Sequence, residues 1–392
     1  MLCSRSSDGL RMRIPQILLF LAIVTTVIGG VHWYLWTRLV RDPGWPPRWS
    51  RAMTGALGLL AVAMPLSMML GRGLPRDVMR PIAWVVYVWM GAAFLLLVCA
   101  LSLDLVRAVL PRPDPTRRTF LARLVAGAVG SMGSALTGGA VAHVASGWTV
   151  RTVPVSLRRL PRSRDGFTIV QLTDIHVGPT IGREYIAALV ARVNALRPDL
   201  IAITGDLVDG NVATLGPLLE PLRELRAPHG VFFVTGNHEY ISGVHSWVAF
   251  LPTLGLRVLH NERVTVGEGA DAFELAGVED HSARRFGADR GPDLSRALRG
   301  WDRARELVLL AHQPKQAKAA AREGVGLVLS GHTHGGQIWP FRYFVYLDQP
   351  WISGLHRERD TQVYVSEGTG YWGPPMRLGT SGEITRVVLR AV

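Results

Sequence analysis

Histidine, aspartate and asparagine side chains recur in this sequence directly after short apolar runs. The clearest case is Ser330–Gln337, which holds two histidines one residue apart together with three glycines, and which follows the apolar run 326–329. Imidazole is the commonest metal ligand among side chains, and side chains at positions i and i+2 reach one site only where the backbone is extended or tightly turned. Glycine permits such a turn because it has no Cβ. By itself, the stretch would also suit a polar surface loop.

Four other apolar runs end in residues of the same kind. They are followed by Asp174-Ile175-His176, by Gly205-Asp206, by Gly236-Asn237-His238-Glu239 and by His312-Gln313. Open α/β sheets place their sites at the carboxyl ends of their strands. Helical patterns lie between these runs, so the residues after about 150 are predicted to form an α/β domain. The five junctions predict a single site at one edge of a sheet.

In this order, the five blocks resemble the signature of the calcineurin-like metallophosphoesterase family. The resemblance covers roughly residues 160–392, and every ligand position of the signature is filled. It implies a four-layer αββα domain with two mixed sheets. It also implies an enzyme, a metal-dependent hydrolase that acts on phosphoester bonds.

The resemblance assigns seven ligands to two divalent ions. One ion would take Asp174, His176, Asp206 and His334, and the other would take Asp206, Asn237, His312 and His332. The shared position needs a carboxylate, because its two anionic oxygens can hold two cations about 3.5–4 Å apart. A hydroxide bridging the ions would be the nucleophile, since coordination lowers the pKa of water. Nitrogen and oxygen ligands without thiolate favour Mn, Fe, Zn or Co, and the sequence does not choose among them.

Three further groups of residues stand close to these ligands in the sequence. His238 follows a ligand directly, and the resemblance gives it a catalytic role, either orienting the phosphate or protonating the leaving oxygen. Asp209 and Glu239 are interpreted as groups that support the ligands or cap a helix. Aromatic residues after the His-Thr-His turn suit either packing or the edge of a site that faces lipid; they are Trp339, Tyr343, Tyr346, Trp351, Tyr371 and Trp372.

The first 150 residues carry most of the apolar content behind the mean hydropathy of +0.20. Four apolar runs, at 14–36, 52–70, 82–103 and 121–145, predict about four transmembrane helices, since about 20 residues cross a hydrocarbon core of about 30 Å. Arginines flank the runs, and Trp33, Tyr34 and Trp36 suit a membrane interface. We therefore expect a membrane domain at 1–150, a basic connector at 151–164 and the catalytic domain at 165–392.

Arg117 and Arg118 precede the fourth run, and their interpretation decides on which side of the membrane we expect the catalytic domain. The pair resembles a twin-arginine export signal, and it also suits plain positive-inside anchors. The export interpretation places a multi-pass protein in the plasma membrane with its catalytic domain on the outer face. The net charge of +13 is explained by arginines beside the membrane runs, where anionic headgroups are the natural counter-charge, so nucleic acid is disfavoured as a partner.

The leading functional hypothesis is a membrane-anchored, dimetal-dependent phosphodiesterase. The chain is similar to the membrane-associated subgroup related to UDP-2,3-diacylglucosamine hydrolase, which implies a lipid-linked or nucleotide-linked phosphoester, membrane lipids as partners and a role in lipid metabolism. Two alternatives stay open. The first is a non-catalytic membrane scaffold with a phosphoesterase shell, and the second is a nuclease. The sequence leaves the substrate and the oligomeric state undetermined.

Overall fold

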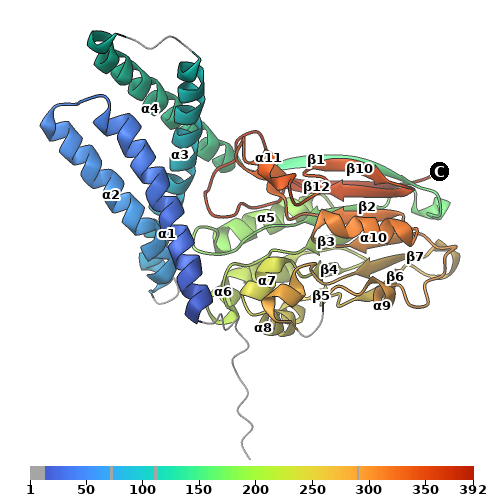
Figure 1. Ribbon diagram of the computed structural model, residues 1–392. Coiled ribbons are helices and arrows are strands. Elements are labelled where there is room, and N and C mark those ends of the chain that lie inside the picture. Colours follow the sequence, from blue (N-terminus) through green and yellow to red (C-terminus); the bar gives the residue numbers. More distant parts are fainter. Residues whose placement is uncertain (1–13, 71–73, 110–113, 289–290) are drawn as a thin grey trace, which may run out of the picture. The chain divides into compact units, whose positions relative to one another are not determined.

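The computed structural model describes residues 14–70, 74–109, 114–288 and 291–392. These residues form two compact units, which Figure 1 shows as a group of long helices and an α/β body. The helical unit holds the described residues from Ile14 to Ser146 together with Gly373–Leu378. The α/β unit holds Gly147–Trp372 and Gly379–Val392.

Where the structure describes it, the helical unit contains four α-helices and one π-helical turn, Thr37–Arg41. The α-helices are α1 (Ile14–Trp36), α2 (Pro47–Leu70), α3 (Arg76–Ala108) and α4 (Pro115–Ala145). Within the described residues, α3 and α4 hold segments long and apolar enough to cross a membrane. The predicted runs 82–103 and 121–145 lie in these two helices. The runs 14–36 and 52–70 lie in α1 and α2, where several side chains fall outside the described residues, so their spanning role stays a prediction.

The α/β unit is built from two six-stranded mixed sheets, as expected. The first sheet has the order β1-β12-β2-β3-β4-β5 and the second has the order β10-β11-β9-β8-β7-β6. The strands of the first sheet are β1 (Thr149–Leu157), β12 (Glu383–Ala391), β2 (Thr168–Leu172), β3 (Leu200–Thr204), β4 (Val231–Val234) and β5 (Leu256–Val258). Those of the second are β10 (Gly354–Glu358), β11 (Thr361–Val365), β9 (Leu327–Ser330), β8 (Leu307–Leu310), β7 (Phe273–Gly277) and β6 (Glu262–Val266).

The parallel strands at the centre of each sheet are continuous apolar runs because both of their faces are covered. Strands β2 and β3 run parallel in the first sheet, as do β8 and β9 in the second, and all four are buried throughout. One core cluster joins the two sheets, with Ile169 and Leu200 from the first and Val308 and Leu327 from the second. The sheets therefore pack face to face.

Helices cover the outer faces of this sandwich. A second cluster packs α9 (Leu294–Ala297) and α10 (Ala317–Arg322) against β7, β8, β9 and β11. Beside the first sheet run α5 (Arg183–Ala195) and α6 (Val212–Leu219), as Figure 1 shows. The remaining short helices are α7 (Asn237–Ile241), α8 (Val244–Phe250) and α11 (Arg342–Val345).

The prediction that residues 151–164 form a connector differs from the structure, which places part of this segment in a strand. The first part of the segment belongs to β1, which pairs in parallel with β12 along nine residues. In β1, the buried residues Val153, Val155 and Leu157 alternate with exposed neighbours, which is the pattern of a strand with one face on the core. In the sequence, arginines flank this short run, so the segment is interpreted as a basic connector and its alternation is not recognised. The connection between α4 and β1 is only residues 146–148.

Candidate metal centre

The seven predicted ligands follow five parallel strands that come from both sheets. Asp174 and His176 follow β2, Asp206 follows β3 and Asn237 begins α7 after β4. His312 follows β8, and the pair His332 and His334 follows β9. Because these strands end at the same edge of the sandwich, the structure brings together residues that lie up to 160 positions apart.

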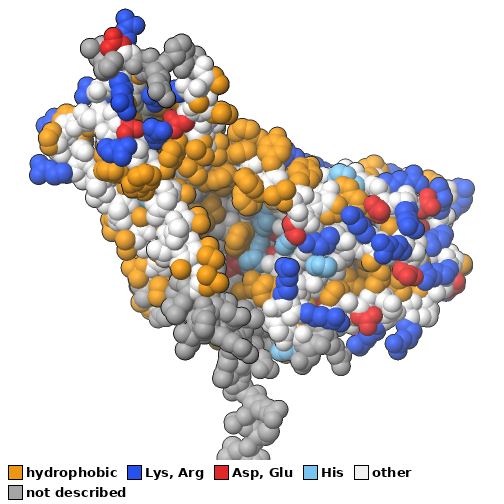
Figure 2. Space-filling model, viewed as in Figure 1, with side chains coloured by type: hydrophobic (Ala, Val, Ile, Leu, Met, Phe, Trp, Pro, Cys, Tyr) orange, Lys and Arg blue, Asp and Glu red, His pale blue; other side chains and the backbone are white. Residues whose placement is uncertain are grey.

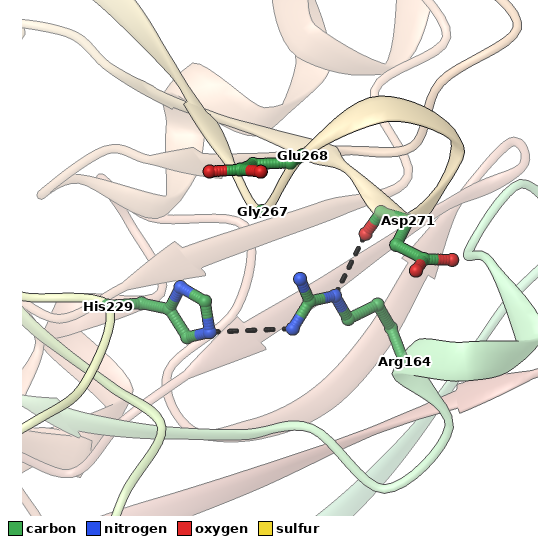
Figure 3. A pocket seen from close by; sticks show the side chains of 5 residues that line it. All are labelled: Arg164, His229, Gly267, Glu268 and Asp271. Carbon is green, nitrogen blue, oxygen red and sulfur yellow. Dashed lines mark hydrogen bonds between the residues drawn. The ribbon is translucent and has the colours of Figure 1, made fainter.

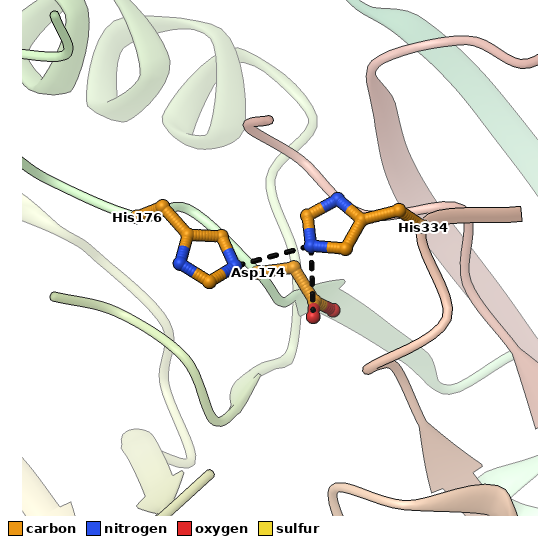
Figure 4. Close-up of side chains that lie close together, drawn as sticks. All are labelled: Asp174, His176 and His334. Atoms are coloured by element: carbon orange, nitrogen blue, oxygen red, sulfur yellow. Dashed lines mark hydrogen bonds and ion pairs between the residues drawn. The ribbon is translucent and has the colours of Figure 1, made fainter. Parts of the chain in front are cut away.

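The first cluster consists of Asp174, His176 and His334, whose donor atoms lie within 4.8 Å of one another. Figure 4 shows the two imidazoles and the carboxylate converging on one point. The Nε2 atoms of His176 and His334 are 3.1 Å apart, and Nε2 of His334 is 3.5 Å from Oδ1 of Asp174. All three residues are buried.

The second cluster consists of Asp206, His312 and His332, within the same mutual distance. Nε2 of His312 lies 3.1 Å from Oδ2 of Asp206 and 3.2 Å from Nδ1 of His332. The side-chain oxygen of Asn237 is 3.3 Å from the same Nε2 atom. Asp206 also approaches the first cluster, because its Oδ2 is 3.9 Å from Nε2 of His176. The placement of Asp206 between the clusters suits a shared ligand.

The donor set of the second cluster fits a cation. Nδ1 of His312 is 2.8 Å from the carbonyl oxygen of Thr204, so its proton is held there and Nε2 is the atom left for the site. Nε2 then faces one carboxylate oxygen, one amide oxygen and a second ring nitrogen. Because both neighbouring oxygens are acceptors, a proton or a metal ion on this atom satisfies them. The carboxylate of Asp206 raises the pKa of His312 well above its usual value although burial opposes this, and a metal ion would replace that proton.

The electrostatic environment prepares other groups for the same role. Burial and the neighbouring His312 lower the pKa of His332 to about 3, so its imidazole is neutral and able to ligate. Burial opposes ionisation of Asp206, but His312 holds the pKa of that carboxyl well below its usual range. Burial raises the pKa of Asp174. A bound cation would offset that cost, because it stabilises the ionised carboxylate.

The ligand loops adopt an uncommon backbone conformation. Of the nine non-glycine residues with positive φ among those that the structure describes, five are predicted ligands. These are Asp174 at 53°, His176 at 55°, Asp206 at 52°, His332 at 70° and His334 at 50°. Such residues cost on the order of 1–3 kcal/mol each and persist where the surroundings fix them, typically at functional sites. Crowding is also tight, since a Cβ at Gly331 would lie 2.2 Å from Oδ2 of Asp174.

Glu239 joins two of the ligand loops. Its carboxylate accepts hydrogen bonds from the backbone N–H groups of Asp206 at 3.0 Å, Leu207 at 2.8 Å and Gly236 at 2.7 Å. It therefore caps the start of α7 and fixes the loop after β3. Burial, reinforced by the charge of Asp206, raises the pKa of Glu239 to about 7.

Asp209 orients two histidines at once. Its Oδ1 is 3.0 Å from Nδ1 of His176 and 2.6 Å from Nδ1 of His238. These bonds leave the Nε2 atom of each ring to face the site. Burial opposes ionisation of Asp209, but the two histidines lower its pKa below the usual value.

His238 lies at the rim of the site. A ring nitrogen of His238 lies within 4.8 Å of donor atoms of His176 and Asp206, although its side chain is 15% exposed. Burial disfavours its charged form, but Asp206 and Asp209 raise the pKa of His238 to about 9. The ring packs edge-on against Trp372 at a centroid distance of 5.6 Å.

The aromatic residues that follow the His-Thr-His turn divide into two groups. Tyr371 is buried, and Trp351 stacks on His356, so these two serve packing. Trp339, Tyr343, Tyr346 and Trp372 are each about half exposed or more. Sequence reasoning missed the bonds that Gln337 makes with the backbone N–H and C=O of Trp372. No local pattern signals this pairing, because the partners are 35 residues apart.

A separate hollow of about 410 Å³ lies at the other edge of the sandwich, near the amino-terminal ends of β4 and β7. Figure 3 shows its lining residues, Arg164, His229, Gly267, Glu268 and Asp271. The guanidinium of Arg164 donates to the backbone oxygen of Asp271 at 2.8 Å and approaches Nε2 of His229 at 3.4 Å. This hollow contains none of the predicted ligands.

Comparison with known proteins gives the same family as the five sequence blocks. The family model for calcineurin-like phosphoesterases matches residues 167–336. A metallophosphoesterase of Aquifex aeolicus is 35% identical over 246 residues, which cover 62% of this chain and 91% of that protein. The chain therefore belongs to the calcineurin-like metallophosphoesterase family.

Two longer relatives are named as transmembrane proteins. Proteins named transmembrane protein with metallophosphoesterase domain are 46% identical over 253 residues in Bos taurus and 41% identical over 246 residues in Danio rerio. The matches cover 62% and 61% of this chain, but only 57% and 56% of those proteins. The chain thus spans little more than half of these relatives. Together with α3 and α4, their names support membrane association.

Proposed function

We propose that this chain is a membrane-anchored, dimetal-dependent phosphoesterase that hydrolyses a phosphodiester. The observation that carries the proposal is the pair of buried ligand clusters joined by Asp206. Two dications held by the carboxylates of Asp174 and Asp206 leave the site with a net charge near +2. Such a site attracts an anionic phosphate ester. The N and O donor set suits Mn, Fe, Zn or Co.

The chain's own residues divide the remaining work. When bound, the two cations supply a water of lowered pKa and neutralise phosphoryl oxygens. Asp209 holds the ring of His238 through Nδ1, so Nε2 is the nitrogen from which a proton passes to the leaving oxygen. Glu239 fixes the backbone of Asp206, which keeps the shared carboxylate in place. The T-shaped contact between the rings of His238 and Trp372 limits the movement of the imidazole.

The proposed substrate is lipid-linked or nucleotide-linked, with membrane lipids as neighbours. Membrane association is supported by α3 and α4 and by the names of the two transmembrane relatives. We further propose a multi-pass protein of the plasma membrane. Its catalytic domain would lie on the outer face, on the basis of the twin-arginine pattern at Arg117 and Arg118.

The first experiment measures metal content and hydrolysis on the full chain in detergent. The protein is stripped with a chelator, reloaded separately with Mn, Fe, Zn or Co, and assayed with bis-p-nitrophenyl phosphate and p-nitrophenyl phosphate. We expect two metal ions per chain and a preference for the diester. Hydrolysis that survives complete removal of metal would overturn the dimetal proposal. No hydrolysis with any of the metals would also overturn it and would favour the non-catalytic scaffold.

A second experiment tests the side of the membrane. Cys3 and Cys99 are replaced by serine, and a new cysteine is introduced by Ala270→Cys in the exposed loop between β6 and β7. We expect an impermeant maleimide to label this cysteine in intact cells. Labelling only after lysis would place the domain in the cytoplasm and reduce Arg117 and Arg118 to membrane anchors.

A further inference from the structure

An exposed aromatic segment, Trp339–Leu347, begins five residues after the predicted ligand His334. Exposed fractions are 48% for Trp339, 50% for Phe341, 62% for Tyr343, 59% for Phe344, 51% for Tyr346 and 84% for Leu347. The segment includes α11, and Figure 2 shows hydrophobic side chains gathered where Figure 1 draws this helix. Soluble surfaces rarely carry so many large apolar side chains in one place, and such patches mark interaction surfaces.

The aromatic segment is fixed at both ends to loops that carry ligands. At its start, Gly336 lies so close to α11 that a Cβ there would approach Cα of Arg342 within 2.4 Å, and its φ is +85°. At its end, the ammonium of Lys315 donates to both oxygens of Asp348 at 2.7 Å. Gln349 donates to the side-chain oxygen of Gln313, the residue after His312, at 3.2 Å. The exposed rings therefore stand on a fixed base beside the metal centre.

The composition of the segment favours a lipid surface as its partner. It carries one cation, Arg342, and no acidic residue, while six of its nine residues are the large apolar or aromatic side chains named above. Tyrosine and tryptophan have an apolar body and a polar tip, so they are favoured at the boundary between lipid headgroups and acyl chains. A nucleic-acid surface would need several cations instead.

A bilayer is within reach of this domain. α4, one of the two helices long enough to cross a membrane, ends at Ala145, and β1 begins at Thr149. The three intervening residues span at most about 15 Å. The α/β unit is therefore held near a membrane surface from its first strand, so docking costs little further freedom of movement.

We propose that Trp339–Leu347 inserts into the interfacial layer of the bilayer that holds the helices. Inserted there, the segment places the metal centre at the membrane surface, where it meets phosphoesters of lipid headgroups. The second statement rests on the proposed hydrolysis of phosphoesters, whereas the docking rests only on the proposed membrane anchoring.

Docking is tested with a site-specific probe, because the chain has 12 tryptophans. In the full chain without Cys3 and Cys99, Tyr343→Cys is labelled with the fluorophore NBD and reconstituted into phosphatidylcholine liposomes. The control is NBD at Ala270→Cys, an exposed position at the opposite edge of the sheets. Lipids with a doxyl group on the fifth acyl carbon should quench the Tyr343 probe about twofold more than the control, since interfacial segments lie about 5–10 Å deep. Equal quenching at the two positions would overturn the proposal. It would mean that solvent, a second copy of the chain or another protein surrounds the segment in place of lipid.

The consequence for the substrate is tested by kinetics. The triple variant Tyr343→Ser, Phe344→Ser and Leu347→Ser is compared with Val392→Ser, a single exposed apolar residue at the opposite edge. On the nitrophenyl ester of phosphatidic acid in liposomes, the triple variant should need about tenfold more surface substrate for half-maximal rate. Its kcat/KM for soluble bis-p-nitrophenyl phosphate should stay within about twofold of the unmodified chain.

Three outcomes separate the two proposals. Equal losses on both substrates would mean that the segment supports the fold of the site, which overturns its role in presenting lipid substrates. An unchanged requirement for surface substrate would overturn the lipid-headgroup assignment. Quenching without hydrolysis of any ester would sustain docking while rejecting the proposed function.

Discussion

Within the described part of the α/β unit, the metal centre and the hollow around Arg164 gather similar residue types, and only the first has the properties of a metal site. Both contain histidine and carboxylate side chains. At the carboxyl edge of the strands, Asp174, Asp206 and His312 are at most 2% exposed, and their donor atoms converge. At the amino edge, Glu268 and Asp271 are exposed, and Arg164 bonds a backbone oxygen instead of facing an empty site.

The difference shows what residue type alone does not provide. In the metal centre, five strands deliver side chains to one point, and Glu239 and Asp209 fix them there. In the hollow around Arg164, the side chains come from connections whose ends face water. Burying polar groups without partners is costly, so the convergence of ligand side chains without a cation is unfavourable in the buried metal centre and not in the exposed hollow around Arg164. Variants at matched positions of the metal centre and of the hollow around Arg164 test this contrast.

The largest effect is expected for Asp206→Asn. A neutral amide cannot hold two dications together, so we expect hydrolysis to be lost along with at least one metal ion, measured by elemental mass spectrometry. The matched control is Asp271→Asn in the hollow around Arg164, which should leave both unchanged. Two bound ions with turnover within tenfold of normal would show that Asp206 is not the shared ligand.

A smaller loss is expected for His238→Ala. Turnover should fall about 10²–10⁴-fold while two metals stay bound, and esters with basic leaving groups should suffer most. His229→Ala, from the hollow around Arg164, is the control and should have little effect. An equal loss for nitrophenyl and alkyl esters would argue for phosphate positioning instead. Loss of metal would make His238 a ligand, an outcome that its distance from His176 and Asp206 allows.

Asp209→Asn should reduce activity less than His238→Ala does. The amide keeps the shape but weakens the bonds that orient His176 and His238. Partners of this kind contribute about 10–100-fold in metal affinity or activity. Titration with Mn or Zn at fixed substrate separates the two, and no shift in either quantity would mean that the ligand rings are held by packing alone.

The smallest effect is expected for Arg164→Ala. This change removes a hydrogen bond to the backbone of Asp271 at a partly exposed position, so it should lower stability by about 1 kcal/mol or less. The midpoint of thermal unfolding in detergent measures it, with hydrolysis and metal content unchanged. A loss of metal would show that this hollow and the metal centre are coupled through the sheets.

Much of the fold could be predicted from the sequence. Apolar runs of four to six residues, each followed by a polar block, predicted the strands β2, β3, β4, β8 and β9 and the α/β class. The resemblance supplied the two mixed sheets and the family, and both are confirmed. Strand β1 was missed, because its alternation is short and lies among arginines. The membrane runs at 14–36 and 52–70, the twin-arginine signal and the outer-face location stay predictions.

The sequence by itself determined which side chains could serve as ligands, since type and position after a strand depend only on local order. Tertiary structure decided what those side chains share. Asp206 approaches both clusters, Asp209 serves two histidines and Glu239 ties two loops, because parallel pairing places β2, β3 and β4 side by side. It also decided that Trp339–Leu347 is exposed beside the metal centre. The physical reason is the same in each case: contacts between residues far apart in the chain depend on strand order and side-chain direction, which no local pattern records.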